Sequence, residues 1–209
     1  MTGGTRSELS VQQILEAADV IRAGGIVIVP TGALYGLAAD PFSDTAVDRI
    51  FAVKGRSKNH PLLLLIPDGS YAAALAPDLP AYARALMKAF WPGRLTLVVK
   101  TAMQFAAGVA ASEGHVGIRL PAHPCTRALV RTLGFPVTGT SANLTGQAGA
   151  GVVADIPRSV RDQSSMILDA GPLPGRLAST VVDVTGDAPR ILREGRVSSE
   201  AIRRLFESG

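Results

Sequence analysis

The feature that most constrains the fold is a pair of short, continuous apolar runs, GIVIV at residues 25–29 and LLLLI at residues 62–66. The second run lies between Pro61 and Pro67, which limit it to the length of a strand. A strand that is apolar on both faces is typical of a sheet covered by helices on both sides. Both runs fall far short of the roughly 20 apolar residues that a transmembrane helix needs. They therefore predict buried strands in a soluble α/β protein.

Helical segments alternate with further strand-like segments along the chain. Residues 10–22 repeat apolar side chains at helical spacing until Gly24 and Gly25 end the pattern. We expect helices at 10–22, 41–51 (with Ser43, Asp44 or Thr45 as N-cap), 79–90, 124–133 and from Ser198 or Ser199 to Phe206. We expect strands at 25–30, 62–66, 95–99, 116–120, 136–143 (running on into a loop), 165–171, 179–184 and 190–194. This alternation predicts an α/β fold with a twisted, open, mixed sheet of about seven strands flanked by helices.

The composition favours one domain with a basic pocket. The chain has 209 residues, of which 47% are hydrophobic and 18% charged, so we expect a single domain over residues 1–209. Its net charge is +4, with basic residues scattered from Arg6 to Arg204, which favours a pocket or patch over a nucleic-acid-binding arm. The start MTGGTRSELS has no apolar signal region, and the single Cys125 rules out an internal disulfide. We therefore expect a cytoplasmic protein that does not associate with membranes.

Several common catalytic motifs are missing from the sequence. It contains no GxxxxGK(S/T), GxGxxG, GxSxG or HExxH pattern. His60, His115 and His123 are not spaced like metal ligands, so we expect no metal bound by protein side chains. Cys125 begins a predicted helix, where its pKa could fall, although a lone cysteine is more often a packing residue. The sequence therefore offers no evident pair of nucleophile and base.

A basic stretch, VKGRSKNHP at residues 53–61, follows the second predicted helix. It places Lys54, Arg56, Lys58 and His60 at every second position. On a strand these side chains would share one face, because successive residues point to opposite sides. A solvated loop is an equally good interpretation, because most charge runs are solvated.

Small hydroxyl and amide side chains follow two of the predicted strands. PTGALYG at 30–36 places Thr31 and Tyr35 after the first strand, and TSAN at 140–143 ends another. Taken singly, the first segment also suits an ordinary glycine-rich turn and the second an N-cap before a short helix. Their common position at strand ends is what makes them candidates for a binding site.

Two arginines occupy unusually apolar surroundings. Arg119 lies inside the strand VGIRLP, where an arginine needs an anion or an acidic partner. Arg193 in RILREG has the same requirement, which Glu194 or Asp183 could meet.

Together, these residues predict a large basic concave pocket. Open α/β sheets bind ligands at the carboxyl ends of their strands, so we expect Lys54, Arg56, Arg119 and Arg193 to line one cavity there. Such a cavity suits a polyanion, and a nucleoside triphosphate is the leading candidate. The missing protein nucleophile then indicates that the substrate supplies its own.

The order of several motifs along the chain resembles that of one protein family. The motifs are GGIVIVPTGALYGLAADPFSDTAVDRIFAVKGR, HPLLLLI, FWPGRLTLVV, VGIRLPAHP, TSANLTG, STVVDV and RILREG. From about Gly24 to Gly195 they resemble the YrdC-type threonylcarbamoyl-AMP synthases, in the single-domain form. The K-x-R and S-x-N that mark this family are intact, at Lys54 and Arg56 and at Ser141 and Asn143.

The resemblance implies a nucleotidyltransferase that uses L-threonine, bicarbonate and ATP. The carboxylated amine of threonine would attack the α-phosphorus of ATP, giving threonylcarbamoyl-AMP and pyrophosphate. A separate tRNA threonylcarbamoyl transferase complex would then modify the tRNA adenosine next to the anticodon. Weak direct binding of tRNA by this chain is left open.

The resemblance also implies roles for residues at matching positions. The catalytic residues would be Lys54, Arg56, Ser141 and Asn143. ATP would be bound by these four together with Lys58 and Arg193, whereas no role attaches to His60. Threonine would lie against Thr31, Tyr35, Arg119, Thr140 and Ser179, with Arg119 pairing its carboxylate. Mg²⁺ would arrive with ATP, held by phosphate oxygens and water.

The chain departs from the family pattern at three places. The usual PTETVYG reads PTGALYG, so Gly32 and Ala33 replace a glutamate and a threonine of the pocket. Ser57 stands where a proline commonly follows the K-x-R, and it should make that loop less rigid. We also expect the C-terminal domain and linker of longer relatives to be missing, so that loops such as 144–151 would close over ATP.

Two other functions fit the same residues less well. One is a paralogue that keeps the fold and binds nucleotide or RNA without this activity, against which the intact S-x-N and Arg193 count. The other is an RNA-binding module with a basic concave surface. The aromatic content of 5%, with no aromatic residue from Lys54 to His60, counts against recognition by base stacking.

Overall fold

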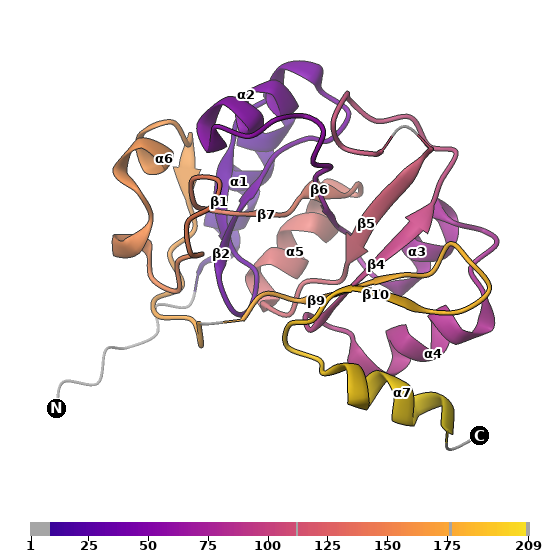
Figure 1. The fold of residues 1–209 in the computed structure, drawn as a ribbon. Coiled ribbons are helices and arrows are strands. Elements are labelled where there is room, and N and C mark those ends of the chain that lie inside the picture. Colours follow the sequence, from indigo (N-terminus) through magenta and orange to yellow (C-terminus); the bar gives the residue numbers. More distant parts are fainter. Residues whose placement is uncertain (1–8, 112, 176, 208–209) are drawn as a thin grey trace, which may run out of the picture.

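Two neighbouring β-sheets form the centre of the computed structural model, which describes residues 9–111, 113–175 and 177–207 (Figure 1). The helices are α1 (Val11–Arg22), α2 (Asp44–Lys54), α3 (Gly69–Leu75), α4 (Ala81–Phe90), α5 (Pro124–Leu133), α6 (Arg158–Asp162) and α7 (Ser199–Glu207), with the 3₁₀ helix η1 (Val153–Asp155). The strands are β1 (Val27–Pro30), β2 (Tyr35–Ala38), β3 (Leu64–Leu65), β4 (Leu95–Lys100), β5 (His115–Arg119), β6 (Val137–Thr138), β7 (Thr140–Ser141), β8 (Met166–Ile167), β9 (Thr180–Asp183) and β10 (Arg190–Arg193).

Both sheets are open and mixed. The four-stranded sheet has the order β7-β2-β1-β8, with β1 antiparallel to β2 and parallel to β8. The six-stranded sheet has the order β10-β9-β4-β5-β3-β6, with β4 parallel to β9 and antiparallel to β5. The predicted α/β class is confirmed. The expected number of strands is too low, because β2 was not anticipated and the segment 136–143 forms two short strands.

Gly139 joins the two sheets. It is the one residue between β6 of the six-stranded sheet and β7 of the four-stranded sheet. Its N–H donates to the carbonyl oxygen of Leu63 at 2.8 Å. A Cβ at this position would lie 2.6 Å from Leu65 Cγ and 2.7 Å from Leu63 Cδ1. The chain therefore passes from one sheet to the other at a point where only glycine fits without movement of its neighbours.

The two apolar runs are buried on both faces, as expected. In β1, Val27 and Val29 belong to a cluster with α1 and α5, whereas Ile28 belongs to a larger cluster on the opposite face. Within LLLLI, Leu64 and Leu65 divide between the same two clusters. Apolar burial on both faces stabilises the strands by about 25 cal/mol per Å² of apolar area removed from water. The continuous apolar character of these runs is thereby explained.

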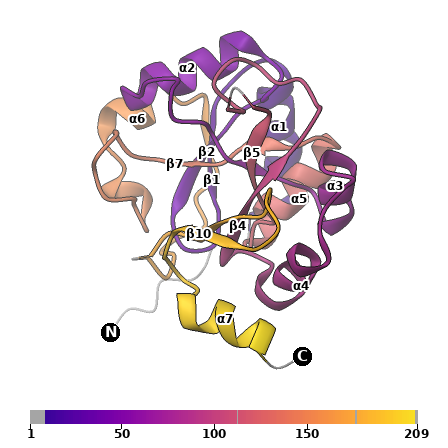
Figure 2. The ribbon, with the colours of Figure 1, turned by 45° about the vertical axis from the view of Figure 1, so that its right-hand side comes forward.

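The remaining helices are arranged around the larger cluster. Helix α7, the last helix of the described chain, lies beside α4 (Figure 2). Tyr82 of α4 and Phe206 of α7 meet edge to face with ring centroids 6.4 Å apart.

Ser43 is the N-cap of α2, where its side chain accepts a hydrogen bond from the N–H of Ala46. Of the three N-cap candidates from the sequence, Ser43, Asp44 and Thr45, the structure therefore has Ser43.

Short elements account for most differences from the sequence prediction. Helices α3 and α6 were not anticipated; each is seven residues long or shorter. Over the ranges 9–111, 113–175 and 177–207, no helix is long and apolar enough to cross a membrane. Residues 1–8, on which the expectation of a signal-free N-terminus partly rests, lie outside the described residues.

Candidate functional site

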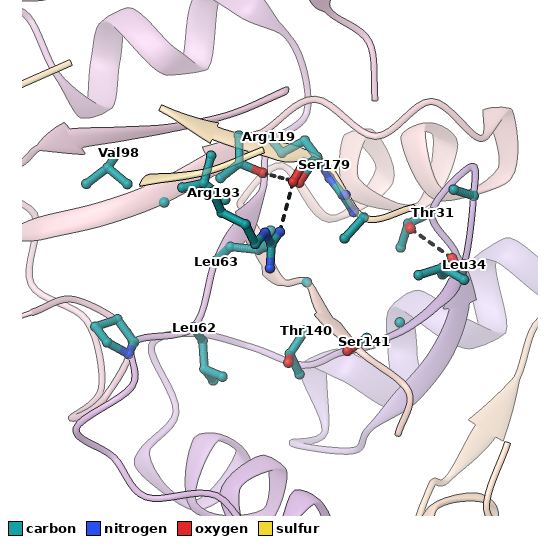
Figure 3. A pocket seen from close by; sticks show the side chains of 18 of the residues that line it. Thr31, Leu34, Leu62, Leu63, Val98, Arg119, Thr140, Ser141, Ser179 and Arg193 are labelled. Carbon is teal, nitrogen blue, oxygen red and sulfur yellow. Dashed lines mark hydrogen bonds between the residues drawn. The ribbon is translucent and has the colours of Figure 1, made fainter. Parts of the chain in front are cut away.

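A cavity of about 420 Å³ lies where the two sheets meet (Figure 3). Its volume is in the range of sites for small molecules. Eight of the expected site residues line it: Thr31, Tyr35, Arg56, Arg119, Thr140, Ser141, Ser179 and Arg193. Three other expected residues lie outside the lining: Lys54, Lys58 and Asn143. The predicted basic pocket is thus present, although its cations differ in part from those expected.

Arg119 is a buried cation with no acidic partner among the described residues. It ends β5 with only 8% of its surface exposed, and its Nε has no hydrogen-bond partner within the described chain. Burial, with a smaller contribution from the charges of Arg193 and Arg196, lowers the pKa of Arg119 to about 10. No aspartate or glutamate occurs among the described residues that line the cavity. Of the two options from the sequence, the acidic partner is not found in the described lining, and the bound anion stays a prediction.

Arg193 lies beside Arg119 but is held by a neutral group. Its Nη2 donates to the carbonyl oxygen of Ser179 at 2.9 Å (Figure 3). The acidic partners that the sequence offered are engaged elsewhere: Glu194 accepts hydrogen bonds from Ser199, and Asp183 is paired with Arg190. Arg193 therefore reaches the cavity with its charge uncompensated by either of these carboxylates.

Hydroxyl groups from different strands and loops line the same cavity as the arginines. The Ser179 and Thr96 hydroxyls form a hydrogen bond of 2.7 Å in the buried wall. The Thr31 hydroxyl donates to the carbonyl oxygen of Leu34 at 2.8 Å, within its own loop (Figure 3). Thr140 is 5% exposed in β7. The cavity thus offers small polar groups and cations on apolar walls, a combination that orients a polar ligand.

Tyr35 anchors a neighbouring loop with its hydroxyl. The group donates to the carbonyl oxygen of Gly171 at 2.8 Å, with Asp169 Oδ1 as a second acceptor at 3.1 Å, and accepts from the N–H of Ala170 at 3.0 Å. Burial, as the largest cause, raises the pKa of Tyr35 to about 12. Tyr35 therefore borders the cavity, but its hydroxyl is held by the loop at 169–171.

Lys54 brings the two family motifs together. Its ammonium donates to the carbonyl oxygens of Ser141 and Asn143 at 2.6 and 2.8 Å, and to Asn143 Oδ1 at 3.0 Å. The Ser141 hydroxyl also donates to Asn143 Oδ1, at 2.6 Å. Burial, followed by the charge of Arg56, lowers the pKa of Lys54 to about 8. The K-x-R and the S-x-N, far apart in sequence, thus form one hydrogen-bonded unit.

The alternating basic residues do not share the face of a strand. Lys54 is the last residue of α2, and Gly55, with φ +57°, caps the helix and turns the chain. Arg56 lines the cavity and donates to the carbonyl oxygens of His60 and Pro61, each at 3.1 Å. Lys58 forms an ion pair with Asp48 outside the cavity lining. The strand interpretation was wrong because the helical pattern of α2 continues to Lys54.

A comparison with protein families decides the classification. The family model described as telomere recombination, for Sua5, YciO and YrdC, matches residues 19–195. This chain belongs to the Sua5/YciO/YrdC family. The match covers the segment in which the motif order indicated the resemblance.

Curated members of the Sua5/YciO/YrdC family are similar over most of the chain. A Mycobacterium tuberculosis protein named provisionally as a threonylcarbamoyl-AMP synthase is 38% identical, over 92% of this chain and 88% of that protein. The Bacillus subtilis threonylcarbamoyl-AMP synthase is 36% identical, over 93% of this chain and 56% of that protein. The crystal structure of Pyrococcus abyssi Sua5 complexed with L-threonine is 32% identical with a TM-score of 0.90, over 96% of this chain and 59% of that chain.

The Gly32 departure from the Sua5/YciO/YrdC pattern has a steric basis. Gly32 has φ +124°, in the region that favours glycine, and a Cβ there would lie 2.7 Å from Ala122 Cβ. Ala122 donates its N–H to the carbonyl oxygen of Thr31 at 3.2 Å. In this backbone, a glutamate could not replace Gly32 unless the segment at Ala122 moved. The loop that carries Thr31 is therefore shaped by glycine here.

Among the described residues that line the cavity, sequence reasoning missed three polar ones, namely Arg196, His115 and Thr96. Arg196 follows Arg193 on the same chain segment, and its proximity to Arg119 depends on how β9 and β10 pair. His115 and Thr96 lie in β5 and β4, strands whose apolar residues drew attention first. Their spacing carried no motif, so only the register of the strands could have found them.

Cys125 is a packing residue in this fold. It is 7% exposed and lies in the cluster formed with α1. Burial raises the pKa of the Cys125 thiol to about 11, which is opposite to the fall that a helix N-terminus can cause. A reactive thiolate is therefore not favoured at this position.

Proposed function

We propose that this chain synthesises threonylcarbamoyl-AMP from L-threonine, bicarbonate and ATP, and is thus a nucleotidyltransferase. The observation that carries the proposal is Arg119, a buried arginine whose Nε has no partner in the described chain, in a cavity lined by hydroxyl groups and further arginines. The names of the relatives in Mycobacterium tuberculosis and Bacillus subtilis support it. The Pyrococcus abyssi Sua5 structure with L-threonine supports threonine as one substrate.

The proposed chemistry requires no protein nucleophile. The amine of threonine adds to the carbon of bicarbonate, water is lost, and a carbamate forms. A carbamate oxygen then attacks the α-phosphorus of ATP. As that oxygen–phosphorus bond forms, the bond from the α-phosphorus to the oxygen that bridges to the β-phosphorus breaks, and pyrophosphate leaves with the electron pair. The protein then has to position the two substrates and stabilise the developing charge.

Threonine is proposed to bind at the buried side of the cavity. Its carboxylate would accept hydrogen bonds from the guanidinium of Arg119, because such charge-assisted pairs are strong and directional. The hydroxyls of Thr31, Thr140 and Ser179 would orient the amine and the side chain. Tyr35 would contribute part of the wall.

ATP is proposed to lie toward Arg56, Ser141 and Arg193, which border the same cavity. Preorganised donors of this kind each lower the barrier by on the order of 3 kcal/mol when they face charge that grows in the transition state. The resemblance also implies contacts of Lys54, Lys58 and Asn143 with ATP. In this conformation their polar groups are engaged with protein atoms.

Magnesium is proposed to enter as part of the substrate, in the Mg·ATP complex. The described residues contain no group of three or more His, Cys, Asp or Glu side chains that could hold a metal ion. The portion of the lining that the structure describes also contributes no carboxylate. Phosphate oxygens and water are therefore the expected ligands, and the ion would neutralise phosphate charge.

The product determines the kind of partner that follows. A mixed anhydride of a carbamic acid and a phosphate is a reactive acyl donor, so a separate transferase must consume it. We propose a tRNA threonylcarbamoyl transferase complex that acts on the adenosine next to the anticodon, with at most weak binding of tRNA by this chain itself. Because these substrates and tRNA meet in the cytoplasm, we propose that the chain acts there.

Release of pyrophosphate tests the proposal. We expect release from Mg·ATP only when L-threonine and bicarbonate are both present, and wild-type rates in Lys88→Met, a control that removes an exposed cation of α4. Pyrophosphate release that ignores threonine would indicate a paralogue with another nucleotide reaction. Salt-sensitive RNA binding without any threonine-dependent turnover would favour an RNA-binding module.

A further inference from the structure

The ammonium of Lys54 has no hydrogen left for a ligand. An ammonium carries three donor hydrogens, and Lys54 has three acceptors, the carbonyl oxygens of Ser141 and Asn143 and the side-chain oxygen of Asn143. Only 3% of the residue is exposed, and it lies outside the cavity lining. In this conformation each of the three donor hydrogens of the Lys54 ammonium is therefore bonded to a protein oxygen.

The backbone of Lys54 accepts hydrogen bonds from the same loop. Its carbonyl oxygen, at the end of α2, accepts from both the N–H and the hydroxyl of Thr145, each at 3.0 Å. Carbonyl groups at a helix end have no partner within the helix, so this contact also caps α2. We call these contacts, between Lys54 and residues 141, 143 and 145, the Lys54 clasp. It fixes both ends of the loop at 141–145 to one residue.

The Lys54 clasp determines where two groups of the cavity point. The hydroxyl of Ser141, which lines the cavity, donates to Asn143 Oδ1, and that oxygen also accepts from Lys54. The amide nitrogen of Asn143 donates to the carbonyl oxygen of Gln147 at 2.5 Å, so its orientation is set from both sides. Arg56 follows Lys54 after the helix cap at Gly55 and faces the same cavity. One buried unit thus places Ser141 and Arg56 relative to each other.

We propose that Lys54 and Thr145 are positioning residues, which hold Ser141 and Arg56 in place for ATP, and that Lys54 does not itself contact the phosphates. A phosphate could reach the ammonium only if a buried carbonyl or amide oxygen lost its donor, which is unfavourable. Thr145 has the same role through its hydroxyl. The kinetic part of this inference rests on the proposed function, whereas its structural part does not.

Hydrogen exchange of the ligand-free protein tests the structural part. Lys54→Met keeps the length of the side chain and removes the donors, so the amides of residues 141–147 should exchange at least about tenfold faster, equivalent to about 1.4 kcal/mol. Arg56→Met is the matched control, because Arg56 donates to His60 and Pro61 and not to this loop. Its loop amides should exchange at the wild-type rate. Unchanged exchange in Lys54→Met would overturn the clasp.

Thr145→Val tests the kinetic part without any change of charge. It keeps the backbone N–H and the side-chain volume but loses the hydroxyl that donates to Lys54. We expect pyrophosphate release to fall about tenfold in kcat/KM for ATP, with the Kd for L-threonine within about twofold of wild type, and Thr145→Ser to restore the rate. Wild-type activity in Thr145→Val would overturn the proposal.

The two experiments separate this inference from the proposed function. If the wild-type chain releases no threonine-dependent pyrophosphate, the proposed function fails, yet exchange in the ligand-free protein still decides whether the clasp exists. If the wild type is active and Thr145→Val is too, the function stands and the positioning role fails.

Discussion

Arg119 is the residue whose burial and charge most clearly call for a bound anion. A buried guanidinium whose Nε lacks a partner in the described chain is unfavourable by itself, and the neighbouring Arg193 and Arg196 add repulsion. A carboxylate that enters would satisfy the donor and reduce the repulsion together. We therefore expect a bound substrate carboxylate to supply negative charge that offsets the charges of the arginines in the cavity.

Arg119→Lys should weaken threonine binding while it keeps the positive charge. A lysine ammonium cannot form the two parallel hydrogen bonds that a guanidinium makes to a carboxylate. We expect the KM for L-threonine to rise at least about tenfold, about 1.4 kcal/mol, with a smaller change for ATP. Initial rates of pyrophosphate release at varied threonine measure this. Arg158→Lys, at an exposed arginine of α6, is the matched control, and an unchanged KM in Arg119→Lys would place threonine elsewhere.

The Lys54 clasp should make the activity sensitive to alkaline pH. The pKa of Lys54 is lowered to about 8, by burial first and then by the charge of Arg56, while its other contacts are the neutral oxygens of Ser141 and Asn143. Below that pH the ammonium has a hydrogen for each acceptor. Above it, the neutral amine has one hydrogen fewer, so a buried oxygen loses its donor.

Activity should therefore fall as the pH rises through about 8, opposite in sign to the rise expected from deprotonation of the threonine amine. A pH profile of kcat/KM for ATP, at saturating threonine and bicarbonate, checks this. A profile that still rises at about pH 9 would contradict the role given to the Lys54 ammonium.

At the scale of elements, Gly139 is the joint between the two sheets. Gly139→Ala would place a Cβ 2.6 Å from Leu65 Cγ and 2.7 Å from Leu63 Cδ1. Overpacking of this kind costs about 1–3 kcal/mol, so we expect a lower urea midpoint with an unchanged m-value. Gly186→Ala is the control, because a Cβ there would have no atom within 4 Å. Equal midpoints for the two variants would show that the junction tolerates a side chain.

Long elements with a strong pattern were predictable, and short ones were not. The helix expected at 124–133 is α5 with the same bounds, because Pro124 begins it and Gly134 ends it. The strands β3, β6, β7 and β8 have two residues each. Elements this short are set by their partners in the sheets more than by local preference. The split at Gly139 belongs to this class, since it depends on where Leu63 and Leu65 lie.

In the basic stretch at residues 53–61, the spacing of two between basic residues is misleading, because it matches the period of a strand. Lys54 fits the strand period of two with Arg56 and Lys58, but it also continues the helical pattern of α2. Helix geometry prevailed because Gly55 supplies the left-handed cap, after which Lys58 pairs with Asp48. A charge pattern alone carries no information about such partners.

At the scale of the whole molecule, the cavity depends on segments from both ends of the chain. The place of Arg119 in the cavity could be predicted, because an arginine in an apolar strand needs a counter-charge. Arg196 and His115 could not, because their place in the lining follows from strand register. Lys54 was expected at the phosphates, yet the fold turns it toward Ser141 and Asn143. Motifs therefore indicated the cavity, and packing determined which motif residues line it.

The origin of the carbonyl carbon in the product tests the central claim most directly. Wild-type protein with Mg·ATP, L-threonine and ¹³C-bicarbonate should give an adenylate whose mass, by mass spectrometry, corresponds to threonylcarbamoyl-AMP carrying one ¹³C, with pyrophosphate in equal amount. The same adenylate should be lost when threonine is omitted. An adenylate without the label, or pyrophosphate released with AMP and no labelled adenylate, would contradict the proposed synthesis.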